Sequence, residues 1–373
     1  MAFLRDAYIP ESVALVVLGI AVGHFVPGVR EAISADVVLF VFVPGLVFDA
    51  AFDLDWPVTR GLLPALVGLA VPGVLVSAAI VSVALTLVGM PLPLAFVVGA
   101  ITAATDPVAV VATLARLRMP HRLRTLIEGE SLFNDGTGLV LFAIAVAAAT
   151  RGLGVAEGAG LFLVTITVSV AAGIAAGFVG AAVLRYARLP PLIFAATLVL
   201  AYATFALCAA VGLSGVLGTV VCALTLGNLL RRDWSGGVVA RQLDRAWSVV
   251  AFALSAVTFL AIGAAIDLTR LGGAILVIAT GVIAVVGARA LFVYVPFVLA
   301  RPVAARGWAH VVFWSGLRGA IALAAALSLP ATLAQGTGVQ EASFGIVLVT
   351  LVGQGATAPL VVRAAMRGTR VGD

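Results

Sequence analysis

Long apolar stretches, separated by short polar segments, recur along the whole chain. Each is close to the roughly 20 residues that a helix needs to cross a hydrocarbon core of about 30 Å. The connecting segments are too short for a catalytic or regulatory domain outside the membrane. We therefore predict one transmembrane domain over residues 1–373, built from about twelve spans at residues 10–29, 35–53, 61–89, 92–115, 124–150, 158–185, 190–211, 213–230, 243–266, 271–300, 307–329 and 342–366.

The composition is that of an all-α polytopic membrane protein, since 63% of the residues are hydrophobic and only 10% are charged. All 22 basic residues are arginines, and the formal net charge is +5. These arginines are divided among separate loops and have no aromatic platform beside them, so we expect no nucleic-acid partner. The partner that the composition does predict is the lipid bilayer.

The placement of the arginines predicts the orientation of the chain, because Lys and Arg accumulate in cytoplasmic loops. If the N-terminus is inside, the outer loops carry only Arg30, Arg151 and Arg270, whereas 17 arginines fall in the inner loops and tails. Both termini are therefore predicted to be cytoplasmic, and the location is predicted to be the cytoplasmic membrane of a prokaryote.

Several carboxylates lie at depth in these apolar spans. Asp106 falls in ITAATDPVAVVATL, Glu130 and Asp135 fall in LIEGESLFNDGTGLVLF, and Asp49 falls in the second span. An ionised group at the bilayer centre costs roughly 2.5 to 3.5 kcal/mol on insertion scales, so such a residue is a functional hypothesis by default.

Only two arginines, Arg289 and Arg318, lie inside predicted helices. Two cations cannot pair with four buried acids. Structural salt bridges would account for some of the acids, but at least one is left to be protonated or to hold a cation.

Helical spacing suggests which acid is left over. Glu130 and Asn134 share one helix face, while Ser131 and Asp135 share the neighbouring face. Our hypothesis is that Glu130 and Asn134 anchor the helix, with Arg289 as the partner, and that Ser131 and Asp135 coordinate an ion.

Asp106 is predicted to lie in a break of its helix, because Pro107 lacks an amide proton and disfavours helical geometry at the preceding residue. Such a break frees carbonyl oxygens, for example that of Thr105, which can bind a hard cation. A second candidate break is the segment 315–323, where two glycines flank a buried arginine.

The segments that contain these residues resemble those of sodium/proton antiporters of the NhaP and NHE type. The combination of TDP, ESLxND and GLRG is specific, and the resemblance covers nearly the whole chain in order. The strongest matches are FVPGLVFDAAFDLD (42–55), ITAATDPVAVVATL (101–114), EGESLFNDGTGLVLF (128–142) and FWSGLRGAIALAAALSLP (313–330), with weaker ones at 211–228, 287–294 and 351–363.

The resemblance implies a fold of inverted repeats with crossed, broken helices. It also implies a core bundle at about 61–150 and 271–366, and dimerisation helices at about 10–53 and 158–266, with Asp49 reaching the core and a homodimer as the assembly. Members usually begin with one further helix, whereas residues 9–23 here resemble their second one.

The resemblance also implies a site, in which the residue matching Asp135 binds cation and proton in turn. The predicted cation and proton site comprises Asp135, Ser131, Thr105, Asp49 and Asp106. Its predicted supports are Asn134, Glu130, Arg289 and Arg318, and Pro107 marks the helix break. The Asn before the Asp goes with electroneutral exchange, and Asp49 stands where Glu is common.

The predicted function is secondary antiport of a monovalent cation, foremost Na⁺ with Li⁺ and K⁺ as the other candidates, against H⁺ with 1:1 stoichiometry. We expect no enzymatic activity and no cofactor. Two other classes of protein would also place carboxylates inside a membrane. A cation channel also needs carboxylates in a pore, and an intramembrane aspartyl protease would use paired aspartates, although the contexts TDP and FND here differ from the YD and GxGD signatures of those enzymes.

Overall fold

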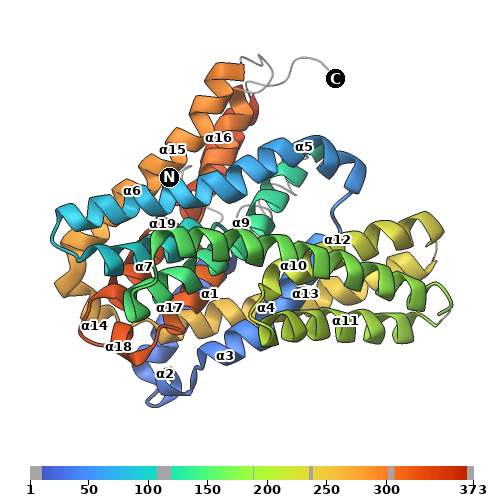
Figure 1. Ribbon diagram of the computed structural model, residues 1–373, viewed down its shortest axis with the longest axis horizontal. Helices are drawn as coiled ribbons and strands as arrows, with labels where there is room; N and C mark the ends of the chain where they lie inside the picture. Colours follow the sequence, from blue (N-terminus) through green and yellow to red (C-terminus); the bar gives the residue numbers. More distant parts are fainter. Residues whose placement is uncertain (1–10, 107–118, 188, 235–237, 301–305, 368–373) are drawn as a thin grey trace, which may run out of the picture.

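The computed structural model describes residues 11–106, 119–187, 189–234, 238–300 and 306–367. Within these ranges the regular structure is entirely helical, and the described residues contain no β-strand. The predicted all-α fold is therefore confirmed. Figure 1 shows the helices as a compact bundle in which α6, α7, α14 and α18 lie toward the left and the far ends of α10 and α11 lie toward the right.

The first half of the chain contains two spans that change helical type along their length, one through η1 and one through η2. Each of these spans has a π-helical turn, η1 next to Pro44 and η2 at Pro72, because a proline removes one backbone hydrogen bond and displaces the preceding turn. The elements are α1 (Glu11–Phe25), α2 (Val29–Ala32), α3 (Ala35–Val37), η1 (Val38–Phe42), α4 (Val43–Phe52), α5 (Trp56–Gly68), η2 (Leu69–Gly73), α6 (Val74–Leu87), α7 (Leu92–Ala103) and α9 (His121–Arg151).

The second half begins with four long helices and contains one interrupted span before the last helix, α19. Between Ser315 and Ala320 the helical hydrogen bonding stops, so one predicted span is divided into two short helices. The elements are α10 (Val155–Leu184), α11 (Pro190–Ala210), α12 (Gly215–Trp234), α13 (Val238–Ala265), α14 (Leu268–Leu271), η3 (Gly272–Ala274), α15 (Ile275–Ala300), α16 (Arg306–Ser315), α17 (Ala320–Leu327), α18 (Ala331–Ala334) and α19 (Val339–Arg367).

The described part of each predicted span contains helical structure, while the count of twelve membrane-crossing helices stays a prediction. In the described part of the chain, nine helical stretches are long and apolar enough to cross a membrane, and α1, α7 and α12 contain shorter apolar helices. The span predicted at 61–89 begins earlier, at Trp56, because Pro57 suits the first turn of a helix and the amide of Trp56 donates to Oδ1 of Asn228 at 2.8 Å. Residues 107–115 of the fourth span lie outside the described residues.

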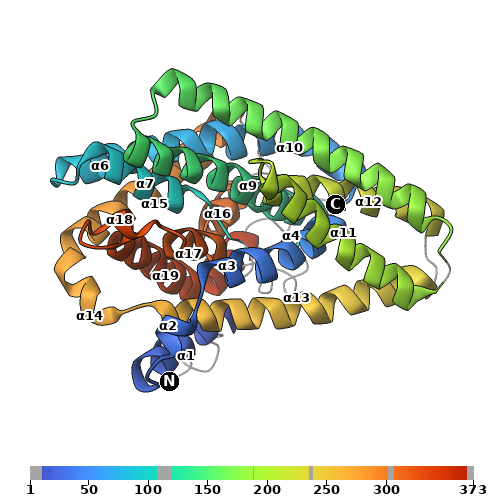
Figure 2. The same ribbon diagram turned by 60° about the horizontal axis from the view of Figure 1, so that its bottom comes forward.

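The helices pack in two neighbouring sets. In one set α12 packs against α10, α4 and α11, and α1 packs against α13; in the other, α6 packs against α7 and α15, and α19 packs against α15 and α16. Helix α9 contacts members of both sets. Figure 2 shows α10 and α12 on one side and α13 on another, with α9 between them.

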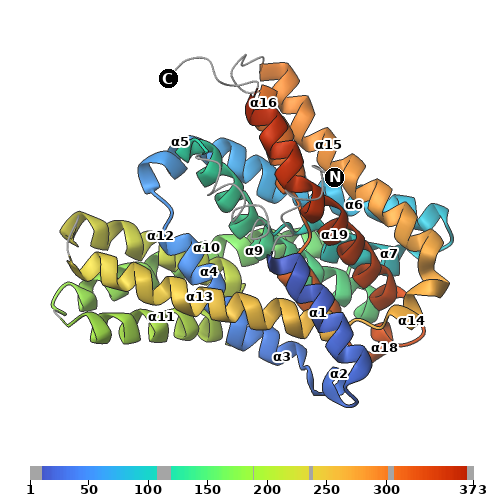
Figure 3. The same ribbon diagram turned by 180° about the vertical axis from the view of Figure 1, so that it is seen from behind.

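Glycines allow the backbones of α1 and α13 to approach closely. A Cβ atom built on Gly19 or Gly263 would overlap backbone oxygens of the facing helix, so neither position accommodates a larger side chain without separating the helices. Figure 3 shows α1 crossing α13 on the rear face of the molecule.

Candidate functional site

The end of helix α7 meets a non-helical segment that separates α16 from α17. Helix α7 ends at Ala103 and continues as a non-helical segment at 104–106, and the segment between α16 and α17 is also non-helical. The amide of Asp106 donates to the carbonyl of Leu317 at 2.7 Å, which joins the two breaks directly. The predicted break between α16 and α17 is therefore present, and it contacts the segment that follows the end of α7. Pro107 and the residues up to 118 lie outside the described residues.

The positive charge of Arg318 lies at the carboxyl end of α7. Its Nε donates to the carbonyl of Thr102 at 2.8 Å, and its Nη1 donates to the carbonyl of Gly316. Thr102 lies in the last turn of α7, where unpaired carbonyls carry partial negative charge. The partners of this buried cation within the described structure are thus backbone oxygens, and no ion pair to an acid is formed there.

Asp106 has the complementary position at the other break. Its Oδ2 accepts a hydrogen bond of 3.1 Å from the amide of Ala320, the first residue of α17, where the amide groups carry partial positive charge. A Cβ atom on Gly319 would overlap the Asp106 carboxylate, so this contact requires glycine at position 319. Each break therefore supplies the charge that the end of the other broken helix needs.

Glu130 and Arg289 form a buried ion pair behind the crossing. Arg289 donates through Nη1 to Oε1 and through Nη2 to Oε2 of Glu130, the second bond being 2.9 Å long, and Nη2 also donates to the carbonyl of Val312 at 2.8 Å. Both side chains are almost fully buried, at 1% and 6% exposure. This two-pronged geometry fixes α9 against α15 and α16.

Asn134 connects this ion pair to the first break. Its Nδ2 donates to Oγ1 of Thr105 at 3.3 Å and to Oε1 of Glu130 at 3.4 Å. Three residues earlier, on the neighbouring face of α9, the hydroxyl of Ser131 donates to the Thr105 carbonyl. The oxygen atoms of the non-helical segment are in this way held against α9.

Asp135 lies one turn beyond Ser131 on α9. It is 7% exposed, and no hydrogen bond or ion pair joins it to another side chain among the described residues. The carboxylate of Asp106 is close enough for the two like charges to interact. The structure therefore brings Thr105, Ser131, Asp106 and Asp135 together around one buried carboxylate.

Asp49 occupies a different electrostatic neighbourhood. It is half-buried on α4, and the acids that interact with it are Asp53, Asp244 and Glu128. Within the described residues no hydrogen bond or ion pair links Asp49 to Asp135. Its place in the cation site stays a prediction from the resemblance.

The site also depends on groups that the sequence did not indicate. These are the carbonyls of Thr102 and Val312 and the amide of Ala320. Almost every residue has a backbone amide and carbonyl, so residue type does not show which of these groups belong to the site. Only the position of the helix ends could have indicated them.

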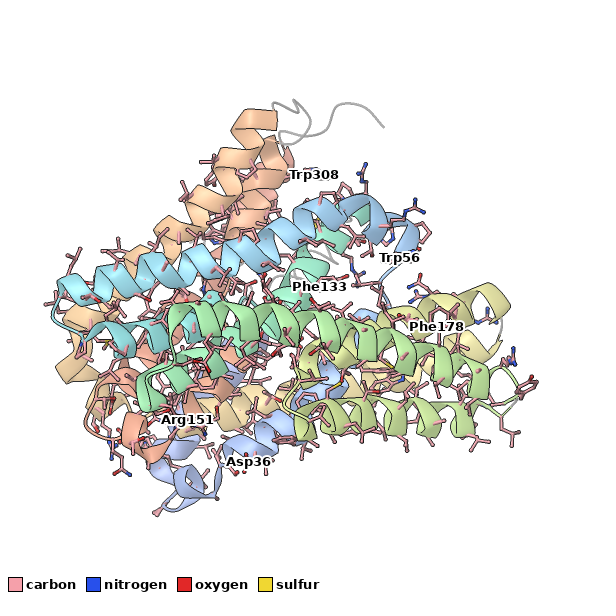
Figure 4. The ribbon with its side chains drawn as sticks, viewed as in Figure 1. Asp36, Trp56, Phe133, Arg151, Phe178 and Trp308 are labelled. Carbon is pink, nitrogen blue, oxygen red and sulfur yellow. The ribbon has the colours of Figure 1, made fainter. Side chains whose placement is uncertain are left out.

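A separate cavity has a different character. It measures about 580 Å³, lies between α5, η2 and α9 on one side and α10 and α12 on the other, and is lined mainly by apolar side chains. Trp56, Phe133 and Phe178, which are labelled in Figure 4, belong to this lining. None of its lining residues has a carboxylate, so the acids of the predicted cation site lie outside this lining.

Comparison with known families gives a clear assignment. The family model described as "Sodium/hydrogen exchanger, transmembrane" matches residues 1–364. This chain belongs to the sodium/hydrogen exchanger family. The family is one of transporters and not of enzymes, and membership confirms the resemblance found in the sequence.

Two curated relatives extend the match over almost the full chain. The chain is 34% identical to the Na⁺/H⁺ antiporter ApNhaP of Aphanothece halophytica, over 97% of this chain and 70% of that protein. It is 33% identical to the low-affinity Na⁺/H⁺ antiporter NhaS1 of Synechocystis sp., over 95% of this chain and 69% of that protein.

The fold resembles that of a solved antiporter. The structure of the sodium proton antiporter MjNhaP1 from Methanocaldococcus jannaschii superposes with a TM-score of 0.76 at 18% sequence identity, covering 96% of this chain and 92% of that one. At this level of identity the similarity establishes the fold.

Proposed function

We propose that this family member exchanges a monovalent cation for H⁺ across the membrane, with both ions competing for Asp135. The observation that carries the proposal is the buried Asp135 carboxylate, which has no ion-pair partner among the described residues and lies beside the oxygen atoms of Ser131 and Thr105. A buried carboxylate must be neutralised, and a proton or a cation can each do so.

The two buried arginines leave Asp135 free for this role. Arg289 is committed to Glu130, and Arg318 is committed to the ends of the broken helices. We assign cation and proton binding to Asp135, Ser131, Thr105, Asp106 and Asp49. The supporting residues are Asn134, Glu130, Arg289 and Arg318.

The proposed cargo is Na⁺, with Li⁺ and K⁺ as further candidates. Relatives described as Na⁺/H⁺ antiporters support this choice, as does the preference of hard cations for carboxylate, hydroxyl and carbonyl oxygens. With one carboxylate carrying either one proton or one monovalent cation, the exchange is 1:1 and electroneutral.

Movement of one helix set against the other would expose the site to each side in turn. In this proposal the core comprises about 61–150 and 271–366, and the dimerisation helices comprise about 10–53 and 158–266. The packing of α6, α7, α15 and α19 as one set and of α10–α13 with α1 and α4 as another supports this division. The acids around Asp49 would attract cations toward the site.

The proposed assembly is a homodimer in a prokaryotic cytoplasmic membrane with both termini on the cytoplasmic side. The distribution of arginines supports this orientation. Asp267 precedes α14, and Arg270 lies within that helix. Asp267 forms ion pairs with both Arg30, at 2.6 Å, and Arg270, so these two arginines, which are predicted to be outside, lie together.

Membership of the exchanger family supports neither of the two alternatives, a cation channel or an intramembrane aspartyl protease. The described residues also contain no group of three or more His, Cys, Asp or Glu side chains that could hold a metal ion. We propose that the transported ions are the only ligands that function requires.

The test is transport by the purified full chain in proteoliposomes that contain a pH-sensitive dye, with Na⁺, K⁺ and Li⁺ gradients imposed in turn. Asp135→Asn is expected to abolish cation-driven proton movement, because the amide binds neither ion in exchange for the other. Asp36→Asn, which changes an exposed acid on α3, is the matched control and should transport normally. Wild-type rates in Asp135→Asn would refute the assignment.

A further inference from the structure

A small cavity borders the proposed ion site. It has a volume of about 20 Å³ and is bordered by α6, α7, α9, α15 and the second helix break. Among its lining residues are Ser77, Asn134 and Arg289, with Thr105 and Arg318 nearby in the same wall. The cavity thus lies between Asn134 and Arg289, and Asp135 is not among its lining residues.

Three buried polar atoms of this lining lack a hydrogen-bond partner in the described structure. They are Oγ of Ser77, Oδ1 of Asn134 and Nε of Arg289, and the exposures of their side chains are 7%, 2% and 6%. Buried polar groups are rarely left unpaired, because they lose their bonds to water without replacement. Three such atoms from three different helices around one cavity therefore need a common explanation.

The size and chemistry of the cavity fit one water molecule. A water needs about 10 to 15 Å³ of accessible volume and typically makes about three hydrogen bonds. A cation does not fit the same place, because the guanidinium groups of Arg289 and Arg318 border it. A neutral molecule that both donates and accepts hydrogen bonds matches the donor of Arg289 and the acceptor of Asn134.

We propose that an ordered water occupies this cavity and that Ser77 is a positioning residue for the ion site. The water accepts hydrogen bonds from Nε of Arg289 and from the hydroxyl of Ser77, and it donates one to Oδ1 of Asn134. All three unpaired groups are satisfied by this arrangement.

The water acts on the site through Asn134. With Oδ1 held by the water, Nδ2 of Asn134 faces Glu130 and Thr105. The carbonyl of the same Thr105 accepts the hydroxyl of Ser131 beside Asp135. A continuous path of hydrogen bonds thus runs from α6 through the water to the oxygen atoms of the first break. This consequence for cation binding rests on the proposed exchange function.

Ser82 provides a matched control on the same helix. It is also a buried serine of α6, at 3% exposure, but its hydroxyl donates to the carbonyl of Ala78 at 2.6 Å and it does not border the cavity. Ser77→Ala and Ser82→Ala remove the same atom from the same helix. Only the first removes a partner of the water.

The direct test is a density map of the full wild-type chain in lipid nanodiscs, at a resolution that shows buried waters. We expect a peak within hydrogen-bond distance of Ser77 Oγ, Asn134 Oδ1 and Arg289 Nε. An empty cavity in a map that shows other buried waters would overturn the proposal. This result does not depend on transport, so it is separate from a failure of the proposed exchange, which would appear as a wild-type protein without cation-driven proton movement.

The functional test compares apparent cation affinity in proteoliposomes. Ser77→Ala should raise the KM for Na⁺ about fivefold, the effect of one lost hydrogen bond, with a smaller change in maximal rate. Ser82→Ala should leave KM unchanged, and Ser77→Thr, which keeps the hydroxyl, should restore it. Equal KM values for Ser77→Ala and Ser82→Ala would refute the positioning role. If Ser77→Ala fails to fold, the wild-type map and Ser77→Thr decide the question.

Discussion

Gly319→Ala adds a single methyl group at the point where the two breaks cross. The new Cβ would overlap the Asp106 carboxylate, so Asp106 must move away from Ala320. That movement removes the 3.1 Å hydrogen bond to the first amide of α17 and disturbs the 2.7 Å bond between Asp106 and Leu317. Both contacts hold the crossing together.

The expected cost follows from these contacts. A hydrogen bond to a charged group contributes about 1.5 to 3 kcal/mol, and an anion at a helix N-terminus contributes about 0.3 to 1 kcal/mol. Their loss should lower the free energy of unfolding by about 2 to 4 kcal/mol. Because Asp106 and Asp135 also interact, the displaced carboxylate should change cation affinity as well.

The assay is equilibrium unfolding in mixed micelles, followed by transport in proteoliposomes. Gly287→Ala is the matched control, because this glycine is exposed in the middle of α15 and a Cβ there meets nothing within 4 Å. The control should be unchanged or slightly more stable, since alanine favours a helix over glycine. If Gly319→Ala is as stable as Gly287→Ala and transports normally, the reciprocal capping of the two breaks is wrong.

Two further predictions concern the ion pairs. Glu130→Gln leaves the Arg289 guanidinium buried without its partner and should cost about 3 to 5 kcal/mol of unfolding free energy, whereas Glu130→Leu combined with Arg289→Met should recover most of it; a double variant as unstable as the single one would contradict this view of the pair. Hydrogen bonds from Thr269, together with the cation Arg30, hold the pKa of the Asp267 carboxyl below its usual 3.8. This depressed pKa stabilises the fold above pH 3.8, and the stabilisation is lost as the pH falls through the folded-state pKa. Asp267→Asn should therefore lower stability at pH 7 by about 0.5 to 1 kcal/mol and have no effect under more acid conditions, as unfolding measured across pH will show; an equal effect at all pH values would exclude the ionic contribution.

The sequence predicted the spans and both helix breaks because these features have local causes. Apolar runs, Pro107 and the glycines at 316 and 319 each act on the backbone of their own segment. The pairing of Glu130 with Arg289 was a hypothesis drawn from helical spacing, and the structure places these two side chains in contact.

Contacts between distant backbone groups were not predictable in this way. Arg318 donates to the carbonyl of Thr102, which is 216 positions away in the sequence. The residue type of Thr102 gives no indication of this contact. Similarly, Ser77 and Ser82 lie in the same apolar pattern, and only the packing of α6 shows that one borders a cavity and the other does not. Asp49 is the converse case, since the resemblance assigned it to the site whereas its interacting acids in the structure are Asp53, Asp244 and Glu128.

The reciprocal arrangement at the crossing has an electrical consequence. Arg318 and Asp106 carry opposite charges, as do Arg289 and Glu130, so these four groups together contribute no net charge to the part of the protein that surrounds Asp135. In the proposed exchange, Asp135 adds no charge either when a proton or a monovalent cation is bound, so the membrane voltage would do no work on the loaded site. An empty site carries one negative charge, on which a potential of 100 mV acts with about 2.3 kcal/mol for a full crossing. Because these four charges cancel, movement of the empty site across the membrane would depend on voltage, whereas movement of the loaded site would not.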